Sequence, residues 1–86
     1  MKATITFHPK AWEDYQYWQK QNKKIVQRIN ELLKDISRNP FTGIGKPEAL
    51  RGNLKGYWSR RIDQEHRLVY KFENDTLIVV QCRFHY

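Results

Sequence analysis

The sequence has too few cysteines for an internal disulfide and no long apolar run. Cys82 is the single cysteine among 86 residues, which fits a reducing compartment. No stretch approaches the roughly 20 apolar residues that span a bilayer. The first residues also lack the apolar core of a signal peptide. These absences predict a cytoplasmic protein that makes no contact with a membrane.

Metal ligands are scarce and poorly spaced. His8, His66 and His85 are scattered, and together with the one cysteine they form no CxxC or HxxxH pair. The sequence therefore predicts no metal site and no cofactor.

Positive charge is in excess, since 16 lysines and arginines face 9 acidic residues and give a net charge of +7. The chain is 40% hydrophobic, too much for a disordered basic tail. Its length predicts a single domain over residues 1–86. The charge favours an anionic partner, most commonly nucleic acid. A lysine-rich soluble surface is the alternative.

Hydrophobic periodicity predicts a strand followed by two helices. Residues 3–7 alternate as a half-buried strand does. Helical spacing runs over 9–21, and again from a capping Asn22 to about residue 39, where Asn-Pro ends it. The short join predicts an antiparallel helical hairpin. Residues 40–53 hold three of the four glycines and two of the three prolines, so they predict a loop.

Three strands are predicted after the loop, over residues 57–63, 66–72 and 76 to about 84. The centre of the last, residues 77–80, is apolar on both faces, which favours a central strand. The fold class is therefore α+β. An N-terminal strand and a two-helix hairpin pack on an antiparallel sheet of about four strands.

Strand parity gathers basic side chains on one face of the predicted sheet. They are Arg61, Arg67, Arg83 and His85. Several arginines on one exposed face repel each other, so the arrangement favours a bound phosphate backbone. The alternative is an ordinary polar outer face with arginines lying flat over it.

Glu48 is an acidic residue in basic surroundings, with Lys46 and Arg51 nearby. Beside cations a carboxylate stays ionised and can accept a proton as a general base. In the alternative interpretation, it only pairs with one of these two cations.

The sequence ends on a histidine and a tyrosine that directly continue a predicted strand. His85 can shuttle a proton near neutral pH, and Tyr86 can stack on a base or hold a phosphate oxygen. Alternatively, Phe84 and Tyr86 complete the core and His85 is solvated.

One reaction uses these groups together: RNA cleavage by attack of the ribose 2′-hydroxyl on the adjacent phosphate. A base removes the 2′ proton, an acid protonates the leaving 5′ oxygen, and a cation stabilises the transition state. Glu48, His85, and Arg67 or Arg61 suit these roles.

Distinctive sequence blocks run along nearly the whole chain: WEDY and YWQ within 12–19, INEL at 29–32, PF and GKPE within 40–48, Leu54 with GYWSRRI at 56–62, EHRLVY at 65–70, and CRFHY at 82–86. Together they resemble the YoeB (Txe/YoeB) toxins of the RelE/ParE superfamily. The blocks match at the right spacing, so the resemblance is specific.

The resemblance implies a toxin of a bacterial type II toxin–antitoxin system. It would be a ribosome-dependent endoribonuclease, or mRNA interferase, that cuts mRNA in the ribosomal A site and inhibits translation without a metal. Its implied partners are mRNA, the 30S subunit with its rRNA, and a YefM-like antitoxin that covers or disturbs the active site. The resemblance also implies a homodimer, with operator DNA bound only through the antitoxin complex.

By the same resemblance, the family's general base falls on Glu48 and its phosphate-binding arginine on Arg67. The general acid falls on His85 and the final tyrosine on Tyr86. These four are the predicted catalytic residues.

The predicted RNA- and phosphate-binding residues are Lys46, Arg51, Arg61 and Arg83. Arg51 stands where the family has a lysine, so it keeps the charge for a phosphate contact but not a role in proton transfer. Phe84 stands where some relatives have a tyrosine.

Two other functions stay open. One is inhibition of DNA gyrase, as in ParE-like relatives, although Glu48 and the His-Tyr ending argue against it. The other is a non-catalytic RNA- or DNA-binding module whose arginines serve only as counterions.

Overall fold

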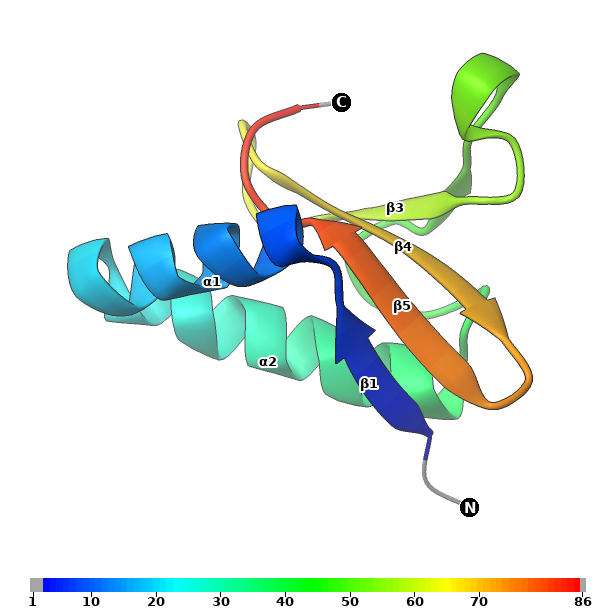
Figure 1. Cartoon of the computed structure of the whole chain (residues 1–86), viewed down its shortest axis with the longest axis horizontal. Coiled ribbons are helices and arrows are strands. Elements are labelled where there is room, and N and C mark those ends of the chain that lie inside the picture. Colours follow the sequence, from blue (N-terminus) through cyan, green and yellow to red (C-terminus); the bar gives the residue numbers. More distant parts are fainter. Residues whose placement is uncertain (1–2, 86) are drawn as a thin grey trace.

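Five strands form one mixed sheet, and two helices pack beside it (Figure 1). The computed structural model describes residues 3–85. The elements, in chain order, are β1 (Thr4–Phe7), α1 (Pro9–Gln21), α2 (Lys23–Arg38), β2 (Glu48–Ala49), the 3₁₀ helix η1 (Gly52–Leu54), β3 (Trp58–Arg61), β4 (Arg67–Glu73) and β5 (Thr76–Gln81). The strand order is β1-β5-β4-β3-β2. The predicted α+β class and helical hairpin are confirmed.

The sheet differs from the prediction in two ways. First, β1 runs parallel to β5, so the sheet is mixed rather than antiparallel. Second, Glu48 and Ala49 pair with β3 and add a fifth strand within the predicted loop. Two residues are too few for a periodic signal, and only the partner strand makes them a strand.

Both helices form where their local signals place them. Pro9 occupies the first turn of α1, where a missing N–H costs nothing. The side chain of Asn22 caps α2 by accepting from the backbone N–H groups of Lys24 and Ile25. Within residues 3–85, neither helix is long and apolar enough to cross a bilayer.

The core lies between the helices and one face of the sheet. Its buried residues from α1 and α2 are Ala11, Trp18, Ile29, Leu32, Leu33 and Ile36. The sheet contributes Leu68 and Tyr70 from β4 and Leu77 and Val79 from β5. The core side chains of β4 alternate with Arg67 and Val69, which point to the other face of the sheet and are also buried.

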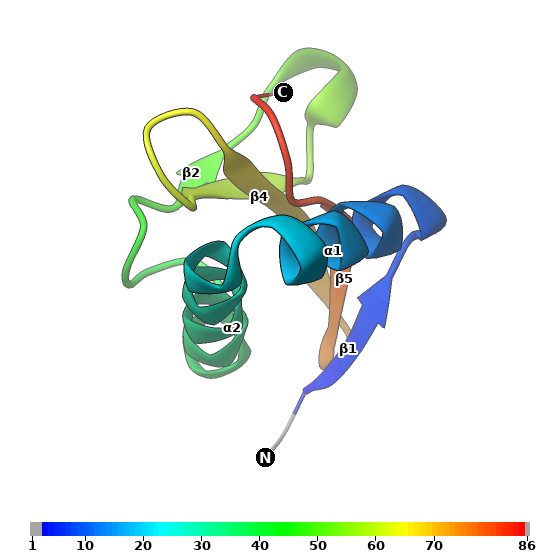
Figure 2. The ribbon, with the colours of Figure 1, turned by 90° about the vertical axis from the view of Figure 1, so that its left-hand side faces the viewer.

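The last strand ends earlier than predicted. β5 stops at Gln81, and residues 82–85, here called the C-terminal segment, leave the ladder. Phe84 has a φ of 67°, which an extended strand does not allow. Figures 1 and 2 show this segment and the loop with η1 rising on the side of the sheet away from α2.

Candidate active site

Glu48 lies on the sheet face that points away from the core. A row of paired residues crosses the sheet from β2 to β4: Glu48, Ser59 and Val69. Paired residues in neighbouring strands point to the same side. Leu68 and Tyr70, which alternate with Val69, are buried in the core, so the row faces the opposite way. This surface is called the site face below.

Two arginines lie side by side on the site face. Arg61 ends β3, Arg67 begins β4, and the two are paired, each two residues from the row that contains Glu48. Cross-strand partners have Cβ atoms about 5 Å apart, and like charges in such positions repel. An anionic ligand would relieve this repulsion.

The guanidinium of Arg67 is held by the turn before β4. Its Nη1 donates to the carbonyl oxygens of Asp63 at 2.8 Å and His66 at 3.1 Å. The residue is only 9% exposed. Within residues 3–85, both of its side-chain hydrogen bonds leave from Nη1, so Nε and Nη2 keep donors for an anion.

Hydrogen bonds fix the C-terminal segment against the start of β4. The Phe84 carbonyl accepts from the backbone N–H of Arg67 at 3.0 Å and from Gln81 Nε2 at 3.3 Å. The Phe84 N–H donates to Nδ1 of His66 at 2.7 Å. His85, the next residue, is exposed and follows directly on this anchored position.

Helix α1 holds the beginning of the same segment. Asp14 Oδ2 accepts from the N–H of Cys82 at 3.1 Å, and Trp18 Nε1 donates to its carbonyl at 2.8 Å. Lys10 Nζ lies 3.1 Å from Asp14 Oδ1, so the buried carboxylate has a cationic partner. Burial raises the pKa of the Cys82 thiol to about 12, so this thiol is a packing group and not a nucleophile.

A buried arginine holds the loop that leads to Glu48. Arg60 is 0% exposed, and its Nη1 and Nη2 donate to the carbonyls of Asn39, Thr42 and Ile44. Its Nη1 also forms a 2.6 Å ion pair with Asp35. The loop is thereby tied to α2 and β3.

Glycine is required where this loop passes over the ion pair. Gly43 has a φ of 126°, and a Cβ there would overlap Asp35 Oδ2. Further along, the carbonyl of Gly45 accepts from the N–H of Arg61 at 2.7 Å. The path of the chain toward Glu48 is therefore set by α2, through Asp35, and by β3, through Arg61.

The ion pair also shifts the pKa of its carboxylate. The hydrogen bond from Arg60 holds the pKa of Asp35 below its usual range, against the opposing effect of burial. Arg60 Nε donates to the hydroxyl of Tyr70 at 3.1 Å. Burial raises the pKa of that tyrosine despite this hydrogen bond.

The structure brings three of the eight predicted site residues to the site face by strand register: Glu48, Arg61 and Arg67. His85 follows Phe84, whose carbonyl accepts from the N–H of Arg67. Lys46 and Arg51 are exposed on either side of Glu48 in the chain.

Arg83 does not join this group. Its guanidinium lies 3.5 Å from the ring centroid of Tyr17 on α1 and 4.4 Å from that of Phe84. The prediction that it shares a face with Arg61 assumed that the last strand continued through it, and the strand ends at Gln81. Tyr86 lies outside the described residues.

Some residues that build the site were not predicted as such. His66 was considered only as a metal ligand, and Asp14 was not singled out. Asp14 nevertheless lies three residues after Ala11 and four before Trp18, on the apolar stripe of its helix. An acid at such a position signals a buried hydrogen-bond acceptor.

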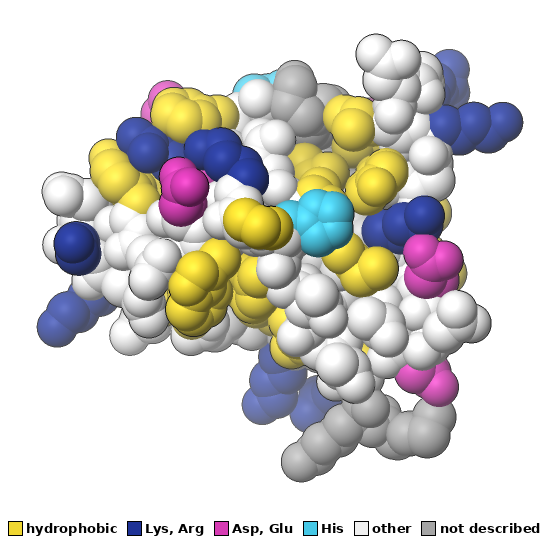
Figure 3. Space-filling model, in the orientation of Figure 1, with side chains coloured by type: hydrophobic (Ala, Val, Ile, Leu, Met, Phe, Trp, Pro, Cys, Tyr) yellow, Lys and Arg dark blue, Asp and Glu magenta, His cyan; other side chains and the backbone are white. Residues whose placement is uncertain are grey.

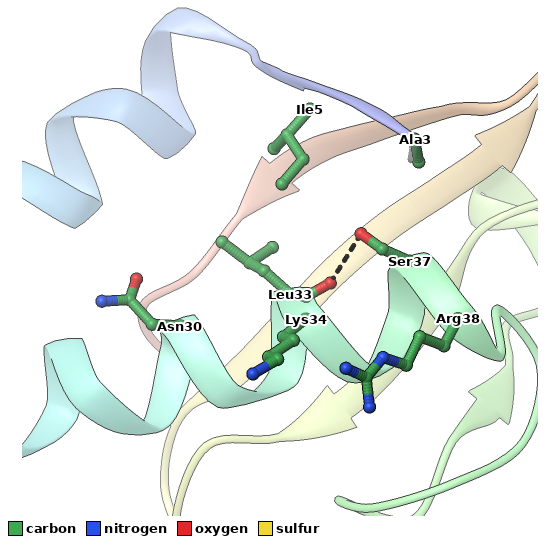
Figure 4. A pocket seen from close by; sticks show the side chains of 7 residues that line it. All are labelled: Ala3, Ile5, Asn30, Leu33, Lys34, Ser37 and Arg38. Atoms are coloured by element: carbon green, nitrogen blue, oxygen red, sulfur yellow. Dashed lines mark hydrogen bonds between the residues drawn. The ribbon is translucent and has the colours of Figure 1, made fainter. Parts of the chain in front are cut away.

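Glu48 and Arg61 are exposed on the site face, whereas Ser59 and Val69 on the same face are buried. One pocket lies elsewhere, between β1 and α2, with a volume of about 480 Å³. Figure 4 shows its lining residues: Ala3, Ile5, Asn30, Leu33, Lys34, Ser37 and Arg38. None of the predicted site residues within 3–85 lines it.

Basic side chains are dispersed over one face of the molecule. On the face drawn in Figure 3, Lys and Arg lie around the periphery, while hydrophobic side chains gather nearer the middle around a histidine. The net charge is therefore not concentrated in one patch there.

The element order and the five-stranded mixed sheet are shared with solved toxins of bacterial toxin–antitoxin systems. A family model described as "YoeB-like toxin of bacterial type II toxin-antitoxin system" matches residues 7–86. The chain is 57% identical over 86 residues to Toxin YoeB of Streptomyces coelicolor, with 100% of both chains covered.

Two solved structures from Staphylococcus aureus are similar over 100% of both chains, each at 53% identity. They are a YoeB dimer, with a TM-score of 0.94, and a heterotetrameric YoeB–YefM toxin–antitoxin complex, with a TM-score of 0.92. The chain belongs to the YoeB-like toxins and is a toxin of a type II toxin–antitoxin system.

Proposed function

We propose that this toxin is a ribosome-dependent endoribonuclease that cuts mRNA in the A site and so inhibits translation. One observation carries the proposal. Across the site face the order is Glu48 on β2, Arg61 on β3, Arg67 on β4, and then the segment with His85. A candidate base and a candidate acid thus flank two cations.

The dimensions of this arrangement suit a single phosphodiester. Neighbouring strands lie about 4.8 Å apart, so three spacings separate Glu48 from the C-terminal segment by about 14 Å between backbones. Side chains that extend inward from both sides can enclose one phosphate group over the arginine pair. Attack and departure in line need groups on opposite sides of the phosphorus.

The reaction follows from these positions. Glu48 accepts the proton of the 2′-hydroxyl, whose oxygen bonds to phosphorus. Arg67 and Arg61 stabilise the charge on the non-bridging oxygens. His85 donates a proton to the 5′ oxygen as its bond to phosphorus breaks. The products are a 2′,3′-cyclic phosphate and a 5′-hydroxyl, and no metal or cofactor takes part. Tyr86 completes the proposed catalytic set, as a group that stacks on a base or holds a phosphate oxygen.

The remaining positive charge supports binding to the 30S subunit and its rRNA. Exposed lysines lie along both helices, at Lys10, Lys20, Lys23, Lys24 and Lys34. They serve as contacts to RNA phosphates in the proposed complex. Lys46, Arg51 and Arg83 are proposed as further RNA contacts.

The solved relatives support two protein partners. The S. aureus relatives form a YoeB dimer and a heterotetrameric YoeB–YefM complex. We therefore include a homodimer and a YefM-like antitoxin in the proposal, with operator DNA bound only through the antitoxin complex. The setting of all these steps is the bacterial cytoplasm.

The test maps mRNA 5′ ends in cells after brief induction of the wild type and of His85→Ala. New ends within codons at the ribosomal A site, absent with His85→Ala, are expected. Intact mRNA with a DNA-damage response would instead indicate a gyrase inhibitor. Intact mRNA with RNA binding retained would indicate a non-catalytic binding module.

A further inference from the structure

His66 lies at the junction of the C-terminal segment, helix α1 and the turn that holds Arg67. It is 9% exposed. Its ring packs edge-on against Trp18, with centroids 4.8 Å apart, and lies 6.0 Å from the Phe84 ring. Nothing in the proposed chemistry uses this buried imidazole, although it touches the segment that carries the proposed acid.

The hydrogen bond of the ring fixes its protonation. Nδ1 accepts from the backbone N–H of Phe84 at 2.7 Å, so this nitrogen carries no proton and the ring is neutral. The proton is then on Nε2, which lies 3.6 Å from the Glu65 carboxylate. The imidazole nitrogen thus acts as the hydrogen-bond acceptor for the Phe84 N–H, a role that a backbone carbonyl usually has.

The backbone of His66 belongs to the same network. Its N–H donates to Asp63 Oδ1 at 2.7 Å, and its carbonyl accepts from Arg67 Nη1 and from the N–H of Ile62. The residue therefore couples the position of the phosphate-binding guanidinium to that of the C-terminal segment.

The anchored residue has a conformation that needs support. Phe84 has a φ of 67°, which is unfavourable for a bulky side chain, and its ring is 47% exposed. Such a conformation persists only where surrounding contacts hold it. Here the Nδ1 acceptor and two donors to the Phe84 carbonyl supply that support.

We propose that His66 is a positioning residue for RNA cleavage: its Nδ1 holds Phe84, and through it the adjacent His85, against Arg67. This inference rests on the proposed function. Without this acceptor, the Phe84 N–H loses its hydrogen bond to His66, and the segment loses one of the contacts that hold it. A misplacement of about 1 Å at a catalytic group can cost about 100-fold in rate.

The test uses two neutral amide variants. In His66→Asn the amide oxygen can occupy the place of Nδ1, whereas in His66→Gln it lies near the place of Nε2. Both remove the imidazole ring from Trp18, and the two replacements differ by one methylene group. Purified toxin is assayed on ribosomes programmed with mRNA, and kcat and KM are measured separately.

We expect kcat of His66→Gln to fall by about ten- to 100-fold, with KM nearly unchanged. His66→Asn should stay within about threefold of the wild type. In a His85→Ala background the His66→Gln change should have almost no further effect, because the positioned group is gone.

A second measurement does not depend on activity. Hydrogen exchange of the Phe84 amide should be faster in His66→Gln than in His66→Asn at equal global stability. Equal kcat for the two variants beside an active wild type, or equal Phe84 protection, overturns the positioning role alone. A wild type that cuts no mRNA on ribosomes overturns the proposed function, and this role with it.

Discussion

Arg60 and Asp35 join β3 to α2 through an ion pair of 2.6 Å directly beneath the loop that leads to Glu48. Arg60 is completely buried, whereas the Asp35 side chain is 25% exposed. The guanidinium also binds three loop carbonyls. This ion pair links α2, β3 and the loop, so it holds the loop that leads to Glu48 in place from the core side of the sheet.

Replacing Arg60 should therefore cost far more stability than replacing its neighbour. We expect Arg60→Met to lower the free energy of unfolding by about 3–5 kcal/mol, because it leaves Asp35 and the loop carbonyls without their donor. Arg61→Met is the matched control on the site face, with an expected change within about 0.5 kcal/mol. Urea unfolding measures both, and equal losses would contradict the role assigned to Arg60.

The same pair makes stability depend on acid pH. Arg60 keeps the pKa of Asp35 lower in the folded than in the unfolded chain. The stabilisation is therefore complete above the unfolded pKa, near 3.8, and is lost as pH falls through the lower folded value. Urea unfolding between about pH 6 and pH 3 should show a smaller loss of stability in Asp35→Asn than in the wild type. Parallel profiles for the two proteins would refute this linkage.

The sequence predicts the features of this fold that are local. The helical periodicity and the Asn22 cap depend on neighbours in the chain, and both occur as predicted. The alternation of β4 does not appear in its burial, because residues 67–70 are buried on both faces. The parallel pairing of β1 with β5 and the two-residue β2 depend on partners at least nine residues away. No local pattern specifies these pairings.

The predictions about the site also succeed where they depend on local sequence and fail where they depend on distant contacts. Parity on β3 and β4 predicts that Arg61 and Arg67 share a face, and the register agrees. Arg83 was assigned to that face because nothing in the sequence marks the end of β5. The strand ends where Asp14 and Trp18, 68 and 64 residues earlier in the chain, bind the backbone of Cys82.

Cys82 should be inert in the folded protein. It is 0% exposed, and burial raises the pKa of its thiol to about 12, so almost no thiolate exists near neutral pH. A disulfide reagent such as Ellman's reagent should label it only as fast as the chain unfolds, and labelling should accelerate in urea. Rapid labelling of the native protein would show that the C-terminal segment detaches from α1.

Loss of the Trp18 Nε1–H donor on α1 should affect the rate of cleavage more than the stability of the fold. Trp18→Phe keeps an aromatic ring but removes the Nε1–H that binds the Cys82 carbonyl. One hydrogen bond contributes about 1 kcal/mol to stability, so the fold should persist. We expect kcat on programmed ribosomes to fall by at least about tenfold, because the segment with His85 loses its first anchor. Tyr17→Phe, at the next position of α1, is the control and should change neither quantity. Unaltered kcat in Trp18→Phe would show that this anchor does not position the acid.

Glu48 and His85 should act at the chemical step and not in binding. Glu48→Gln and His85→Gln keep similar shapes but cannot accept or donate the required proton. Each should lower kcat by about 10²–10⁴-fold, while the affinity for ribosomes, measured by co-sedimentation, stays close to that of the wild type. The double variant should be little worse than either single one, because the two groups act on one transition state. Arg67→Ala is the contrast: it removes a phosphate contact, so mRNA cleavage and the salt dependence of binding should both change. If Glu48→Gln and His85→Gln cut mRNA at the wild-type rate, the acid and base lie elsewhere on the chain.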